Sequence, residues 1–113
     1  MKIKVDQDVL ERKLLLLGFR ESLSGTRYLR DAIMAWEPGM SMTKDLYPEV
    51  GKMHQTTAAR AERAMRHAIE TAFERANYDT VVGLFGYSLN PEKGCPTVSE
   101  FVARMARVCA VED

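Results

Sequence analysis

The sequence has few cysteines, no long apolar run and no excess of charge of either sign, and each shortage excludes a class of protein. Cys95 and Cys109 are the 2 cysteines in 113 residues, too few for a secreted domain held by disulfides, so a reducing cytoplasm is the expected compartment. The longest aliphatic run, residues 14–17, is far below the ~18 residues that span a membrane. The first residues also lack the apolar block of a secretory signal. We therefore expect a cytoplasmic protein with no membrane partner.

Charge and composition leave the partner open but limit the size of the fold. The 16 basic and 16 acidic side chains balance, so the net charge argues neither for nor against nucleic acid. A hydrophobic content of 46% in 113 residues is enough for the core of one compact domain and too high for a disordered chain. The positions of the charges must therefore indicate the function.

Residues that could carry chemistry are scarce and scattered. His54, His67 and the two cysteines have no zinc-ligand spacing, and the sequence has no glycine-rich loop of the kind that holds phosphate. His67 and Glu70 lie three residues apart, but acid–base catalysis also needs a pocket and a third positioned group. We expect no metal, no cofactor and no catalytic residue, and hence a protein that is not an enzyme.

Apolar residues recur at helical spacing along the chain, and no segment shows the period-two alternation of a strand. The third helical region covers residues 43–54, with a break at Pro48, and the fourth covers residues 58–75. Four side chains are expected to cap the first, second, fifth and sixth helices: Asp6, Thr26, Asp79 and Thr97, the last in a capping box with Glu100. The predicted class is all-α.

The third and fourth helices are expected to form a helix-turn-helix. Only residues 55–57 separate residues 48–54 from residues 58–75, and Gly51 offers a small residue where two helices cross closely. The fourth helix has an apolar side made mostly of alanine, which would let it lie close to its neighbours: Ala58, Ala61, Met65, Ala68, Ile69 and Ala72.

The opposite side of the fourth helix carries a graded charge. Arg60, Arg63 and Arg66 lie in its first turns, whereas Glu70 and Glu74 lie toward its end. A helix that enters the major groove of DNA by its N-terminal residues has this distribution, because its cations then meet phosphates and base edges. The pattern indicates a DNA-reading helix.

The charged residues of this face allow DNA reading and two ordinary interpretations. Arg63 can hold guanine in a bidentate contact and Glu62 can accept from cytosine N4, so the two could read a G·C pair. However, Glu62 and Arg66 could also be a simple ion pair on a solvated face. A protein-interaction module that has lost DNA binding is the competing class. Such a module would have no evident need for three arginines on one exposed face.

Five blocks of the sequence resemble one family, the C-terminal effector domain of the master sporulation response regulator of endospore-forming bacteria. The two central blocks are residues 46–52 (LYPEVGK) and 56–70 (TTAARAERAMRHAIE). The others, in the same order as in the family, are YLRDAI at 28–33, LFGY at 84–87 and PTVSEF at 96–101. The similarity extends from about Leu15 to about Val108.

The resemblance implies a fold, a function and a set of contact residues. The fold would be a six-helix bundle with a helix-turn-helix that binds a short DNA box with a CGA core as a head-to-tail pair and activates or represses promoters. The expected DNA-contacting residues are Lys52, Thr56, Thr57, Arg60, Glu62, Arg63, Arg66 and His67. The segment expected to touch the sigma factor of RNA polymerase contains Val81, Leu84, Phe85 and Tyr87. For Phe85 and Tyr87, packing under the following loop is an equally good interpretation.

Two departures from the family are visible. Ala59 stands where the family typically has a serine that can bond DNA. The usual N-terminal receiver domain is absent from this sequence, and a tail of residues 1–8 precedes the effector domain expected at residues 9–113. An excised output domain and a stand-alone relative without phosphorylation control both fit this arrangement.

Overall fold

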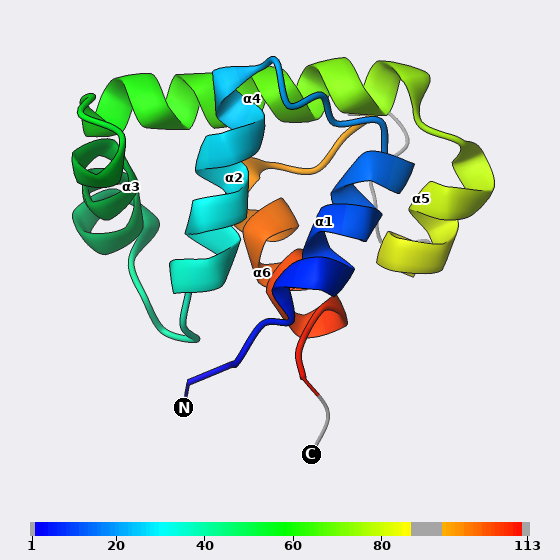
Figure 1. Ribbon diagram of the computed structural model, residues 1–113, viewed down its shortest axis with the longest axis horizontal. Coiled ribbons are helices and arrows are strands. Elements are labelled where there is room, and N and C mark those ends of the chain that lie inside the picture. The colour runs from blue at the N-terminus through cyan, green and yellow to red at the C-terminus, as the bar shows by residue number, and fades with distance from the viewer. Residues whose placement is uncertain (1, 87–93, 112–113) are drawn as a thin grey trace.

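The computed structural model describes residues 2–86 and 94–111, which form six α-helices and one π-helical turn (Figure 1). The elements are α1 (Gln7–Leu16), α2 (Ser24–Ala35), η1 (Met42–Leu46), α3 (Tyr47–Met53), α4 (Ala58–Arg75), α5 (Tyr78–Phe85) and α6 (Val98–Val108). No strand is present in these residues, although Val5 and Ala110 form an isolated antiparallel bridge. The expected all-α class with six helices is confirmed.

Two of the expected helix caps are confirmed. The carboxylate of Asp6 accepts a hydrogen bond of 3.2 Å from the Val9 amide at the start of α1. At the start of α6, the Thr97 hydroxyl accepts from the Glu100 amide and the Glu100 carboxylate accepts from the Thr97 amide. Both caps satisfy amides that have no partner within their own helix.

The other two expected caps are wrong. Helix α2 begins at Ser24, and Thr26 is buried within its first turn at 2% exposed. The cap of α5 is Asn77, whose side-chain oxygen accepts from the amides of Asp79 and Thr80. Asp79 is therefore inside the first turn of α5, where its negative charge interacts favourably with the positive end of the helix dipole.

The break expected at Pro48 is a π-helical turn. The Leu46 amide donates to the Ser41 carbonyl at 3.0 Å and the Tyr47 amide donates to the Met42 carbonyl, both five residues back. Pro48 then lies in the first turn of α3, where its missing N–H costs nothing. A new short helix with Pro48 in its first turn is therefore present, as expected, and the interruption before it is the wider turn of η1.

Helix α4 runs along one edge of the molecule, with α3 at its N-terminal part and α2, α1 and α6 beside it (Figure 1). Its buried residues are Ala61, Met65, Ala68, Ile69 and Ala72, all at most 2% exposed, while Ala58 is half-buried. The apolar stripe predicted for this helix is confirmed, and it joins α4 to the core.

Glycine at position 25 allows α2 to lie directly on α4. A Cβ added at Gly25 would overlap the carbonyl oxygen of Ala64, and it would lie 2.6 Å from the Ala64 carbonyl carbon and 2.9 Å from the Ala68 Cβ. No larger residue fits this backbone contact. The small residues of both helices therefore fix how closely α4 is held.

An aromatic cluster fills the core where α4, α5 and α6 meet. Phe85 stacks on Phe101 with ring centroids 5.7 Å apart, and Phe73 and Phe19 lie 6.1 and 5.3 Å from Phe101. Trp36 is buried, as expected, beneath the Arg107 guanidinium, which lies 5.2 Å from the ring. These contacts hold the C-terminal helix against the rest of the bundle.

The segment expected to be an N-terminal tail is packed against the C-terminal segment. Val5 is buried and bridges to Ala110. The Asp6 amide donates to the Cys109 carbonyl at 2.7 Å, and the Val111 amide donates to the Lys4 carbonyl at 2.8 Å. The first helix begins two residues earlier than the expected domain boundary, so this segment belongs to the fold.

Candidate nucleic-acid interface

The candidate interface is built from α3, the turn at residues 54–57 and the first half of α4. Within the turn, the Thr56 amide donates to the Gly51 carbonyl at 2.8 Å. A Cβ at Gly51 would lie 2.9 Å from the Thr56 carbonyl oxygen and 3.0 Å from the Thr57 carbonyl carbon. The close approach predicted at Gly51 is confirmed, although its partner is the turn and the start of α4.

Gln55 bends the chain between the two helices. Its φ of 55° is the left-handed conformation, and among the described non-glycine residues it has the only positive φ. Such a conformation costs an L-residue roughly 1–2 kcal/mol. The turn between α3 and α4 is therefore strained at one residue.

We predict that Gln55→Gly raises the free energy of unfolding by about 0.5–1 kcal/mol, because glycine has no Cβ and removes the steric cost of the left-handed conformation. The greater conformational entropy of glycine in the unfolded chain cancels part of this gain. Urea denaturation followed by circular dichroism measures the change. Gln55→Ala keeps the Cβ and is the matched control, with no gain expected. Equal stabilities for the two variants would contradict a strained turn.

The polar face of α4 is exposed to solvent along its length. Six of its charged or titratable side chains are exposed: Arg60, Arg63, Arg66, His67, Glu70 and Glu74. Thr57 caps the helix, with its hydroxyl accepting from the Arg60 amide at 3.1 Å. Basic groups thus project from the N-terminal half of the face, and acidic groups from the C-terminal half.

The arginines on this face differ in their partners. Arg66 Nε lies 3.5 Å from a carboxylate oxygen of Glu62, so the expected ion pair is present. Among the described residues, neither Arg60 nor Arg63 forms an ion pair. The ordinary solvated-face interpretation therefore accounts for Arg66 and leaves the guanidinium groups of Arg60 and Arg63 available for an anion.

Two surface hollows flank Glu62 and Arg66. The larger, about 410 Å³, extends from Tyr47 along α4 to the segment that begins α6. The smaller, about 370 Å³, lies at the start of α4 and is lined by Thr43, Tyr47, Ala58, Ala59, Glu62, Arg63 and Arg66. Ala59, the position that departs from the family serine, contributes only a methyl group to this hollow.

Tyr47 is the aromatic side chain common to both hollows. Burial raises the pKa of the Tyr47 phenol, and the negative charge of Glu62 raises it further. The phenol therefore stays protonated at physiological pH and keeps a hydrogen that it can donate to an anion. Tyr47 was not among the expected contact residues.

The remaining expected DNA contacts surround the N-terminal half of α4. Lys52 is exposed on α3, Thr56 is half-buried in the turn and Thr57 is exposed at the cap. The chain thus brings together Lys52, the two turn threonines and the basic part of α4 on adjoining elements.

Residues 10–108 match the protein-family model described as Sporulation initiation factor Spo0A C terminal, which covers most of the 113 residues. The chain belongs to this family. The family's domain is the DNA-binding effector domain of a transcription regulator in sporulation, and it is not an enzyme.

In this Spo0A C-terminal domain, the segment expected to meet the sigma factor is partly internal. Leu84 and Phe85 are each 6% exposed, and Phe85 stacks on Phe101, whereas Val81 is half-buried. Tyr87 lies outside the described residues. For Phe85, the packing interpretation agrees with the structure, so a partner docking on α5 would meet mainly its other side chains.

Other kinds of site find little support in the described part of the Spo0A C-terminal domain. No group of three His, Cys, Asp or Glu side chains in residues 2–86 and 94–111 is arranged to hold a metal ion. None of the helices in those residues combines the length and hydropathy needed to cross a membrane. The exposed face of α4 is the best-defined candidate site.

Proposed function

We propose that this chain, as a member of that family, binds double-stranded DNA of specific sequence and thereby regulates transcription. In this proposal α3 and α4 are a helix-turn-helix, and α4 enters the major groove by its N-terminal half. The supporting observation is that two guanidinium groups, Arg60 and Arg63, form no ion pair with any described residue and lie on the exposed first turns of a helix whose other side is buried. The domain would act in the cytoplasm, on the bacterial chromosome.

The proposal divides the contact residues between reading and holding. Arg63, Glu62 and His67 would face the bases, with Arg63 binding guanine in a bidentate contact. Arg60, Arg66 and Lys52 would contact phosphates or base edges, together with Thr56 and Thr57 of the turn. The Glu62–Arg66 pair, at 3.5 Å, is loose enough to open when Arg66 approaches a phosphate.

A direct binding titration tests the function. The chain is titrated against a labelled duplex that contains a CGA box and against a scrambled duplex of the same composition, with fluorescence anisotropy as the readout. We expect tighter binding to the box. Binding to neither duplex would overturn the proposal and favour the protein-interaction module that has lost DNA binding.

Binding should weaken steeply as salt is raised. If three of the four cations Lys52, Arg60, Arg63 and Arg66 neutralise phosphates, log affinity falls with log salt with a slope of about −2.7, so a fourfold rise in salt weakens binding roughly 40-fold. Anisotropy titrations at several salt concentrations measure the slope. Glu74→Lys, at the far end of α4, is expected to change the salt slope much less. A slope near zero would contradict the proposed face.

Self-pairing and polymerase contact are proposed as consequences of DNA binding. The chain has no long heptad seam, so we expect a monomer in solution that pairs head to tail only on two adjacent boxes, where the shared duplex raises the effective concentration. The α5 region would then present its exposed side chains to a sigma factor. Sedimentation of the free domain as a stable dimer would contradict template-dependent pairing.

A further inference from the structure

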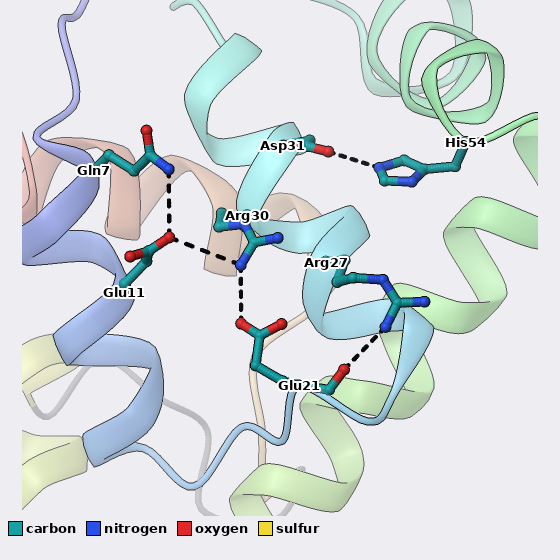
Figure 2. Close-up of polar contacts among 7 residues, drawn as sticks. All are labelled: Gln7, Glu11, Glu21, Arg27, Arg30, Asp31 and His54. Atoms are coloured by element: carbon teal, nitrogen blue, oxygen red, sulfur yellow. Dashed lines mark hydrogen bonds and ion pairs between the residues drawn. The ribbon is translucent and has the colours of Figure 1, made fainter.

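Besides the shared apolar core, three close contacts join α2, α3 and α4. Gly25 holds α2 on α4, and Gly51 holds the end of α3 against the turn and the start of α4. The third contact, between α2 and the end of α3, is polar. His54 Nε2 lies 2.6 Å from a carboxylate oxygen of Asp31 (Figure 2).

His54 occupies the point at which α3 ends and the strained turn begins. It is the C-cap of α3, and Gln55 with its φ of 55° follows directly. Its ring also contacts Tyr28 of α2, with the ring centroids 4.5 Å apart. Because an ionised carboxylate can only accept, His54 Nε2 donates the hydrogen in this bond. The His54 side chain thus joins α2 to the point where α3 passes into the turn.

We propose that His54 and Asp31 are positioning residues for DNA binding. Their bond holds the end of α3 on α2, and this placement sets where Lys52 and Thr56 meet the phosphate backbone, whereas Thr57 is held on α4 as its cap. The inference rests on the proposed function. Since α4 is attached to α2 independently at Gly25, loss of the bond displaces the phosphate contacts and leaves the base-reading residues of α4 in place.

A second polar cluster on α2 provides a control for loss of the His54–Asp31 bond. On the same helix α2, Arg30 Nη1 lies 2.8 Å from Glu21 and 3.8 Å from Glu11 of α1 (Figure 2). The hydrogen bonds and ion pairs of this second cluster with described residues link α2 to α1 and to the loop before α2, and none of them involves α3 or α4. Breaking it removes a surface ion pair of similar chemistry without releasing the end of α3.

The test compares four forms of the domain on the CGA-box duplex and the scrambled duplex, each measured well below its unfolding temperature. His54→Phe keeps a ring against Tyr28 but loses Nε2, and it should weaken binding to both duplexes by roughly three- to tenfold, the effect of one net hydrogen bond. Asp31→Asn keeps an acceptor oxygen and should stay within about twofold of wild type. Glu21→Ala should also stay within about twofold.

The outcomes separate the positioning role from a general loss of stability. Unchanged affinity in His54→Phe overturns the inference and leaves the proposed function intact. Weaker binding of His54→Phe to the CGA-box duplex alone has the same two consequences. Equal weakening in Glu21→Ala also overturns it. If His54→Phe does not fold, Asp31→Ala removes the same bond from the other side and must weaken both duplexes alike. Wild-type domain that binds neither duplex overturns both the inference and the proposed function.

Discussion

Gly25→Ala is expected to lower the free energy of unfolding by about 3 kcal/mol, the upper end of the usual cost of overpacking a core. The added methyl would overlap the Ala64 carbonyl oxygen and approach the Ala68 Cβ to 2.9 Å. Backbone atoms of α4 cannot rotate away as a flexible side chain could, so α2 and α4 must separate along their contact. A loss of this size is a large fraction of the stability of a small domain, commonly about 5–15 kcal/mol.

Gly83→Ala is the matched control for this substitution. Gly83 lies in α5, is exposed and has no atom within 4 Å of an added Cβ. Alanine there should be neutral or stabilise the fold by up to about 1 kcal/mol, because it favours the helix. Urea denaturation of both variants gives the comparison. Similar stabilities for the two alanine variants would show that the α2–α4 contact can adjust and would refute the backbone-contact argument.

Arg63→Ala is expected to weaken binding to the CGA-box duplex by about 1–3 kcal/mol, with much less effect on the scrambled duplex. Arg63 is exposed, has no ion-pair partner among the described residues and precedes His67 by one helical turn. A bidentate contact with guanine depends on the base, so its loss relaxes the preference at one G·C pair. Anisotropy titration of the variant against both duplexes, and against boxes with that pair changed, measures the effect.

Lys52→Ala is the contrasting variant. Lys52 lies on α3, and its proposed partner is a phosphate, which every duplex presents. Its removal should weaken both duplexes alike and reduce the salt slope by about one unit. A merely solvated face predicts negligible change for both substitutions. If Arg63→Ala weakened both duplexes equally, Arg63 would be a phosphate contact, and the assignment of the reading residue would be wrong.

Features that depend on neighbouring residues could be predicted from the sequence. The capping box of Thr97 and Glu100 and the buried stripe of α4 were predicted correctly, because both follow from spacing within one helix. The exposed arginine face follows from the same periodicity. The start of α2 could not be predicted in this way, because Gly25 must be helical to lie on α4 and this contact moves the start ahead of Thr26.

Features that depend on contacts between distant parts of the sequence could not be predicted, because no local spacing indicates them. Asp31 and His54 are 23 residues apart, and no local pattern indicates that they meet. Tyr47 was recognised as part of a family block, but its place beside Glu62 depends on how α3 lies on α4. The ion pairing of the arginines also required the structure: Arg66 pairs with Glu62, whereas Arg63 forms no ion pair with a described residue, and spacing alone does not decide this.

The bridge between Val5 and Ala110 brings both ends of the described chain to one place, and Figure 1 shows that they leave the bundle on the side away from α4. Anything tethered to either end, whether another domain, a purification tag or a dye, therefore starts from the side of the molecule that faces away from the arginine-bearing helix. The two ends offer attachment points for immobilising or labelling the domain while the surface proposed to meet DNA stays accessible.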